Sequence, residues 1–143
     1  TNTGIVLTNG VFDILHKGHI ELLKFSKMQG TKLIVAIDSD RRVKELKGND
    51  RPINNQEDRR RILETNRYVD EVVIFDSVEE LQGFYDTLSP NVIVKGSEWT
   101  ADEVRERDNI PENVQIKVYP LVGDYSTTNT MHKIRDMETC EKI

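Results

Sequence analysis

The sequence is poor in the residues and motifs that several large protein classes require. Its single cysteine, Cys140, excludes an internal disulfide and suits a reducing compartment. The longest unbroken apolar run, Leu33–Ile37, is far too short to span a bilayer. The first residues show no basic segment followed by a long apolar one, so we expect no secretory signal. These absences predict a cytoplasmic protein with no membrane partner.

Several glycine-rich motifs and an excess of positive charge are also missing. Without G-x-G-x-x-G after the first apolar segment, or G-x-x-x-x-G-K-[ST] anywhere, a dinucleotide-dependent oxidoreductase and a Walker-type NTPase are disfavoured. The chain has no G-x-S-x-G nucleophile elbow. Its 20 Lys and Arg against 25 Asp and Glu give a net charge of −5, which argues against a nonspecific nucleic-acid binder.

What is present is an alternation of short apolar segments with helical patterns. The expected strands are Ile5–Thr8, Thr31–Ile37, Glu71–Phe75, Val92–Lys95 and Gln115–Tyr119. Helices are expected over Lys17–Gln29, over a short charged segment that reaches about Lys47, and over Glu57–Asn66. A fourth helix is expected to run from a Ser77 cap to about Leu88, with Glu80 placed for a capping box, and a last helix is expected to start at Ser126. The alternation predicts one α/β domain over residues 1–143, a Rossmann-like doubly wound, mostly parallel five-stranded sheet with helices on both faces. Ligands of such sheets bind beyond the carboxyl ends of the strands.

The strongest functional signal is segment 8–19, T-N-G-V-F-D-I-L-H-K-G-H. His16 and His19 stand at the start of the expected helix, where free backbone N–H groups and the helix dipole attract anions and should hold both pKa values below the ordinary range. Gly18 between them lets a phosphate approach the backbone. We therefore predict a phosphate site. The alternatives are a pair of capping or core histidines, or a metal site that includes Asp13.

A second signal is a basic stretch in this acidic chain. Residues 41–67 hold nine Lys or Arg against five Asp or Glu, a local charge of +4. Such a region suits a small polyanion better than a nucleic acid. We expect Lys47 and Arg59, on either side of the loop around Gly48 and Pro52, to contact phosphate. The alternative is a solvated helix face, which Arg60 and Arg61 fit at least as well.

Two further segments place useful groups after expected strands. Lys95 and Gly96 end the fourth strand, and Trp99 just beyond suits either covering a base or substrate or packing on the core. Ser126 and Thr127 open the last helix, where hydroxyls cap a helix and bind phosphate with the same geometry.

These segments resemble the H-x-G-H nucleotidyltransferase superfamily, the cytidylyltransferase-like group, over nearly the whole chain. N-G-V-F-D-I-L-H-K-G-H at 9–19 is similar to the superfamily's opening. The adenylyltransferase domain of bacterial ADP-heptose synthesis is resembled by L-K-G at 46–48, R-P at 51–52, E-D-R at 57–59 and S-T-T-N at 126–129. R-Y-V-D-E-V at 67–72 is similar to a segment of glycerol-3-phosphate cytidylyltransferases.

The resemblance implies transfer of a nucleoside monophosphate from an NTP to a sugar phosphate, with release of pyrophosphate and with Mg²⁺ carried by the NTP. It implies that His16 and His19 stabilise charge on the α-phosphate and that Lys47 neutralises the reacting phosphates. We expect nucleotide or phosphate contacts from Thr8, Asn9, Gly10, Gly18, Lys95, Gly96, Ser126 and Thr127, and acceptor contacts from Asp13, Arg59 and Trp99. It also implies a homodimer, to which residues 67–72 could contribute.

The base and the acceptor stay open between two members of the group. Glycerol-3-phosphate cytidylyltransferases commonly carry an arginine a few residues before S-T-T, and Leu121–Tyr125 contains none. We therefore favour ATP and heptose 1-phosphate over CTP and glycerol 3-phosphate. Alternatives from other classes are a non-catalytic nucleotide-binding module, an aminoacyl-tRNA synthetase fragment, which should carry a K-M-S-K-S loop, and a receiver domain built on Asp38, Asp40 and Lys95.

Overall fold

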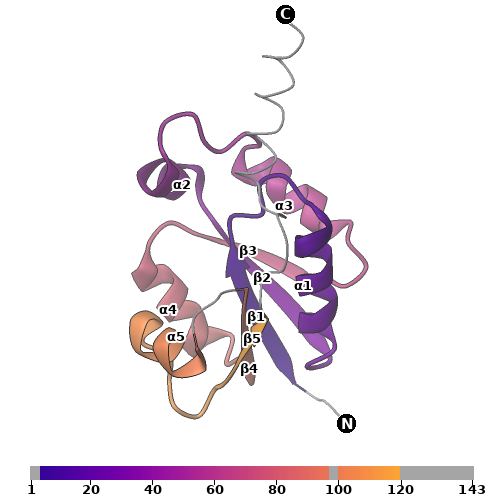
Figure 1. Cartoon of the computed structure of the whole chain (residues 1–143), viewed down its shortest axis with the longest axis vertical. Helices are drawn as coiled ribbons and strands as arrows, with labels where there is room; N and C mark the ends of the chain where they lie inside the picture. Colours follow the sequence, from indigo (N-terminus) through magenta and orange to yellow (C-terminus); the bar gives the residue numbers. More distant parts are fainter. Residues whose placement is uncertain (1–3, 97–99, 120–143) are drawn as a thin grey trace, which may run out of the picture.

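A computed structural model describes residues 4–96 and 100–119, and strands and helices alternate along it (Figure 1). The strands are β1 (Ile5–Gly10), β2 (Lys32–Asp38), β3 (Glu71–Phe75), β4 (Val92–Gly96) and β5 (Gln115–Tyr119). The helices are α1 (Lys17–Lys27), α2 (Asp40–Lys47), α3 (Gln56–Glu64), α4 (Val78–Thr87) and α5 (Ala101–Asp108).

The strands form one five-stranded sheet in the order β3-β2-β1-β4-β5, and every neighbouring pair is parallel. The chain starts in the central strand, runs outward through β2 and β3, and then returns to the other side of β1 for β4 and β5. The order therefore reverses between β1 and β4, and ligands of open α/β sheets bind at such a reversal, beyond the carboxyl ends of the strands. The predicted fold class is confirmed.

Apolar side chains cover both faces of the sheet, which is why its inner strands read as continuous apolar runs. One face packs against α1 and α3, and the other packs against α4 and α5, which lie on the opposite side of the sheet (Figure 1). Alternate residues of β2 serve the two layers, with Leu33, Val35 and Ile37 in the first and Ile34 and Ala36 in the second. This burial of both faces stabilises the frame that holds the strand ends together.

The ends of the elements differ from the expected ones by a few residues. Strand β1 continues to Gly10 rather than Thr8, and α1 ends at Lys27 rather than Gln29. Ser77 caps α4 as predicted, with its Oγ accepting from the Glu80 N–H at 3.2 Å. The Glu80 carboxylate accepts from the Asp76 N–H instead of completing the expected capping box on Ser77.

Helix α5 is an element that the hydrophobic pattern did not predict. Seven of its eight residues are left outside the core and only Val104 is buried, so the helix has no apolar stripe to detect. Its readable signal is the capping box formed by Thr100 and Glu103. The helix expected from Ser126 lies outside the described residues. In the part of the chain that the structure describes, no helix has the length and apolarity to cross a membrane.

Candidate functional site

The two histidines of segment 8–19 cap helix α1 reciprocally. His16 is the N-cap residue, and its Nδ1 accepts from the His19 backbone N–H at 3.4 Å. The Nδ1 of His19 accepts from the His16 backbone N–H at 3.3 Å, and the two rings stack with 3.8 Å between their centroids. Because Nδ1 accepts in both rings, the proton of each neutral imidazole lies on Nε2. The pair therefore caps the helix at its positive end, and the His19 ring also forms a hydrogen bond with the Ile14 backbone.

Both histidines have a lowered pKa, which favours the neutral imidazole near pH 7. Burial lowers the pKa of His16. Burial also lowers the pKa of His19, to about 4, and the charges of His16 and Lys47 add to this effect against an opposing hydrogen bond with the Ile14 backbone. The predicted direction is confirmed, but the main cause is desolvation rather than the helix dipole.

The loop between β1 and α1 explains why His19 is desolvated. The buried Phe12 ring lies 5.2 Å from the His19 ring, centroid to centroid. A side chain at position 10 would bring its Cβ within 2.9 Å of that Phe12 ring, so the close approach requires Gly10. Gly10 thus shapes the loop by leaving space for Phe12.

Titration of the two imidazoles by NMR tests this geometry. Without ligand we expect the pKa of His19 near 4 and that of His16 below 6.5, so that both rings stay neutral until the solution is acidified. A bound triphosphate should raise both pKa values because its negative charge favours the imidazolium form. Identical titration curves with and without nucleotide would show that no phosphate lies beside the rings.

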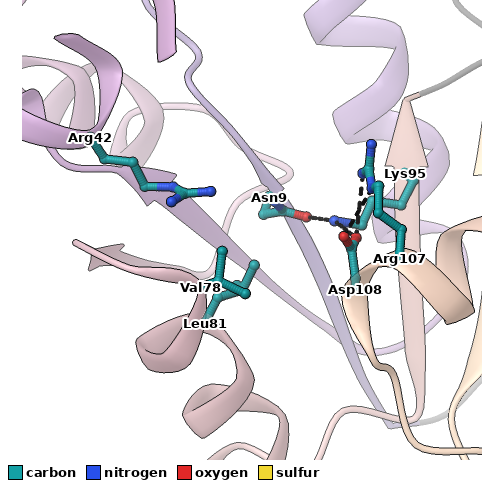
Figure 2. A pocket seen from close by; sticks show the side chains of 7 residues that line it. All are labelled: Asn9, Arg42, Val78, Leu81, Lys95, Arg107 and Asp108. Atoms are coloured by element: carbon teal, nitrogen blue, oxygen red, sulfur yellow. Dashed lines mark hydrogen bonds and ion pairs between the residues drawn. The ribbon is translucent and has the colours of Figure 1, made fainter. Parts of the chain in front are cut away.

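A second group of polar side chains gathers where β1 and β4 end. The Lys95 ammonium donates to the Asn9 Oδ1, as Figure 2 shows, so the side chains of two expected phosphate-binding residues meet. They line a cavity of about 330 Å³ whose other walls come from α2, α4 and α5. Its remaining lining residues are Arg42, Val78, Leu81, Arg107 and Asp108. Gly96 completes β4 beside Lys95.

The cavity combines three cations with one carboxylate. Lys95, only 5% exposed, pairs with Asp108 at 2.8 Å, and Asp108 also accepts from the Arg107 Nε at 3.1 Å. Burial lowers the pKa of Lys95, while the Asp108 charge opposes that shift. Burial acts to raise the pKa of Asp108, but Lys95 and Arg107 hold it below the ordinary value. A cationic cavity with one hydrogen-bond-accepting carboxylate suits a phosphorylated ligand that carries hydroxyl groups.

Lys47 belongs to the histidine side of this region. It is the last residue of α2, its side chain is exposed, and its charge is one cause of the low pKa of His19. His16 and Lys47 are therefore close enough to His19 for their charges to affect its pKa, and such a group of basic side chains favours a polyanion.

The side chain of Arg59 is engaged within the protein, and its expected phosphate contact stays a prediction. Its side chain is fully buried, and its guanidinium donates to the carbonyls of Asn54, Val11 and Asp38 at 2.8–3.0 Å. It also forms an ion pair with Asp40 at 2.9 Å. Arg59 fastens α3 to the ends of β1 and β2, and all its nitrogens already have protein partners.

The side chains of Thr8 and Asp13 also form hydrogen bonds within the protein, and their expected ligand contacts stay predictions. The buried Thr8 hydroxyl donates to the Val94 carbonyl at 2.8 Å and joins β1 to β4. The buried Asp13 carboxylate accepts from the backbone N–H groups of Ile53 and Asn54 at 2.6 and 2.8 Å. It clamps the segment between α2 and α3.

The remaining predicted positions divide into three groups. Gly18 lies in the first turn of α1, between the histidines. Trp99, Ser126 and Thr127 fall outside the described residues. The carboxylates of the receiver alternative are engaged separately, Asp38 with Arg42 and Asp40 with Arg59. Within ranges 4–96 and 100–119 no three His, Cys, Asp or Glu side chains gather as a metal site would require.

Sequence reasoning missed several residues that the structure places at the site. They are Arg42, Arg107 and Asp108, which line the cavity. Arg42 was visible only as a member of the basic stretch, and Arg107 and Asp108 come from the helix that was not predicted.

Known proteins similar to this chain agree with the geometry. Residues 7–142 match the family model described as Cytidylyltransferase-like. Curated relatives include the bifunctional protein HldE of Campylobacter fetus, 44% identical over 92% of this chain, and that of Koribacter versatilis, 42% identical over 90%. The chain spans only 28% and 26% of the length of these two relatives.

Solved structures show the same fold. A lipopolysaccharide core biosynthesis protein from Thermoplasma volcanium superposes with a TM-score of 0.67 and 26% identity, covering 85% of this chain and 98% of that one. Pantothenate synthetase from Thermus thermophilus superposes with a TM-score of 0.59 and 14% identity, over 84% of this chain and 56% of that one, a likeness of fold alone.

Proposed function

The chain belongs to the cytidylyltransferase-like family, and we propose that it transfers a nucleoside monophosphate group from an NTP to a sugar phosphate. The observation that supports this most directly is the positive end of α1, where two neutral, Nε2-protonated imidazoles stand beside Lys47. Such an arrangement offers hydrogen bonds and positive charge to a triphosphate without holding a covalent nucleophile.

The proposed reaction needs no proton transfer from the protein. A phosphate oxygen of the acceptor, already an anion, attacks the α-phosphorus of the NTP and forms a new P–O bond. The bond from the α-phosphorus to the bridging oxygen breaks, and pyrophosphate leaves with the electron pair. Catalysis then depends on positioning the two phosphates and on stabilising the charge that develops between them.

Each part of the site has a place in this proposal. His16, His19 and the α1 backbone bind the triphosphate, which enters as its Mg²⁺ complex because that ion usually binds through phosphate oxygens. Lys47 offsets the mutual repulsion of the two reacting phosphates. The chain is proposed to act as a homodimer through residues 67–72, where the exposed Arg67 guanidinium lies 5.0 Å from the centre of the Tyr68 ring.

The acceptor is proposed to occupy the cavity beyond β1 and β4. Lys95, with Arg42 and Arg107, would bind its phosphate, and Asp108 would accept from its hydroxyl groups. The volume of about 330 Å³ suits a ligand of monosaccharide size. The cavity and the histidines lie beyond the same strand ends, so the two substrates would meet at the reversal of strand order.

ATP and heptose 1-phosphate are the proposed substrates. The L-K-G, R-P and S-T-T-N segments are similar to the adenylyltransferase domain of ADP-heptose synthesis. The HldE relatives and the neighbour named for lipopolysaccharide core biosynthesis support the same acceptor class. CTP and glycerol 3-phosphate are the second candidate pair, favoured by R-Y-V-D-E-V at 67–72.

A pyrophosphate-release screen tests the proposal. ATP, CTP, GTP and UTP are each mixed with Mg²⁺ and with heptose 1-phosphate, other sugar phosphates or glycerol 3-phosphate. We expect release only when ATP and heptose 1-phosphate are both present. Release with CTP and glycerol 3-phosphate would support the second pair, and no release from any combination would point to a non-catalytic nucleotide-binding module.

Replacing Lys95 tests the acceptor cavity. We expect Lys95→Gln to raise the KM for the acceptor at least ~10-fold, because a charge-assisted hydrogen bond to phosphate is worth about 1.5–3 kcal/mol. The KM for the NTP should change little. The matched control is Lys32→Gln at the amino end of β2, an exposed lysine whose ion pair with Glu71 is worth little. A rise confined to the KM for the NTP would show that the acceptor does not bind in this cavity.

A further inference from the structure

Arg51 is a buried cation, and two of its three side-chain nitrogens have no hydrogen-bond partner in the described part of the chain. It lies between α2 and α3, and its side chain is only 6% exposed. Its nearest acid is Asp13, with 3.9 Å between Nε and Oδ2, which is too long for a hydrogen bond. Its Nε and Nη2 atoms are buried with no hydrogen-bond partner among residues 4–96 and 100–119.

The burial of Arg51 is difficult to explain as a purely structural feature. A guanidinium keeps its charge under all ordinary conditions, and leaving its donors unpaired away from water is costly. Arg59 shows how the same fold treats an arginine that serves structure, since its Nε, Nη1 and Nη2 all donate to protein oxygens. Arg51 therefore has the character of a donor group that is held in place for an absent acceptor.

Its one ion-pair partner among the described residues, Asp13, connects Arg51 to the loop that precedes the histidines. Asp13, which holds the segment after Arg51 through the Ile53 and Asn54 N–H groups, belongs to the loop that leads from β1 to His16. With both carboxylate oxygens bound to backbone donors, Asp13 orients the arginine without closing a hydrogen bond to it. Lys47, four residues before Arg51, acts on His19 by its charge.

We propose that Arg51 is a phosphate-binding residue of this site and that Asp13 is its positioning residue. The ligand chemistry is a phosphoryl group, which a guanidinium can bind through two parallel N–H···O bonds. Two sources fit, the triphosphate and the phosphate of the acceptor. This inference rests on the proposed function for the identity of those ligands, while binding itself can be measured without turnover.

The test is direct binding by calorimetry to wild type and Arg51→Met, with a non-cleavable ATP analogue plus Mg²⁺ in one arm and heptose 1-phosphate in the other. We expect affinity to fall at least ~10-fold in one arm, which identifies the source of the phosphate. Thermal stability should stay the same or rise, because methionine fills similar space without an unpaired charge. The control is Arg61→Met on the exposed face of α3, which should change neither affinity.

Other outcomes separate this inference from the proposed function. Unchanged affinity in both arms, or a wild type that binds neither ligand, would overturn the role of Arg51. The wild type could bind a ligand but release no pyrophosphate, while Arg51→Met loses that binding. This result would support the phosphate-binding role of Arg51 and contradict the transferase activity. Should Arg51→Met fail to fold, Arg51→Lys decides, because it keeps the charge but not the paired donors and should weaken the same arm several-fold.

Discussion

Replacing His19 with alanine is expected to lower kcat at least ~10²-fold, the loss seen when one donor to a developing anion is removed. His16→Ala should have a similar effect. Both neutral rings stand at the start of α1, so their N–H groups would stabilise charge on the α-phosphate as the new bond forms. Because that charge is greatest in the transition state, the loss should appear in kcat more than in KM.

The reciprocal cap makes a control necessary, because each histidine also supports the helix. Removing an N-cap side chain costs about 1 kcal/mol of stability, which could be mistaken for a loss of activity. His16→Asn keeps an oxygen that can accept from the His19 N–H but removes the imidazole Nε2. This variant should melt like wild type and still lose kcat. A normal kcat in His16→Asn, or changes confined to KM in all three variants, would contradict the proposed role.

Replacing Lys47 with glutamine is the second change for which we expect a large effect, about 10²-fold in kcat. Two phosphates must approach each other during the reaction, and a single ammonium near both offsets several kcal/mol of repulsion once water is excluded. Lys47 is already close enough to His19 for its charge to lower that residue's pKa. Its replacement should therefore also raise the pKa of His19 in the free protein, which NMR can detect without any substrate.

Lys44 provides the matched control, since it is an exposed lysine one turn earlier in α2. Lys44→Gln removes the same charge from the same helix and should leave both kcat and the pKa of His19 close to those of wild type. Equal losses in the two variants would show that the general basic potential of the region matters rather than Lys47 itself.

The fold was predictable because its strands are unusually distinct. Leu33–Ile37 and Val72–Phe75 are short apolar runs bounded by polar residues, and in β2 the burial of both faces removes any need for alternation. Helix α5 was not predictable in the same way. A single buried residue, Val104, produces no periodicity, although the cap formed by Thr100 and Glu103 was a usable signal.

The candidate site was predictable in position but less so in detail. The H-x-G-H pair was found because two histidines and a glycine at a helix start have a specific chemical meaning. The sequence did not reveal that Thr8, Asp13 and Arg59, whose residue types bind phosphates or acceptors, are buried. Spacing in the sequence gives the location of a side chain along the chain, and only packing decides whether its polar atoms reach a ligand.

The same limit hid the residues that line the cavity. Lys95 was expected from its place at a strand end, but its partner Asp108 is the last residue of α5 and comes close only when that helix packs on the sheet. Arg51 has buried donors without a partner and Arg59 does not, a difference that neither composition nor spacing reveals.

The most direct test of the account is a crystal structure of this chain with Mg²⁺ and an ATP analogue that cannot be cleaved at the α-phosphorus. The account predicts that phosphate oxygens lie within hydrogen-bond distance of the His16 and His19 rings and of the backbone at the start of α1. Triphosphate bound elsewhere on the protein, with both imidazoles unchanged and out of contact with it, would contradict the account.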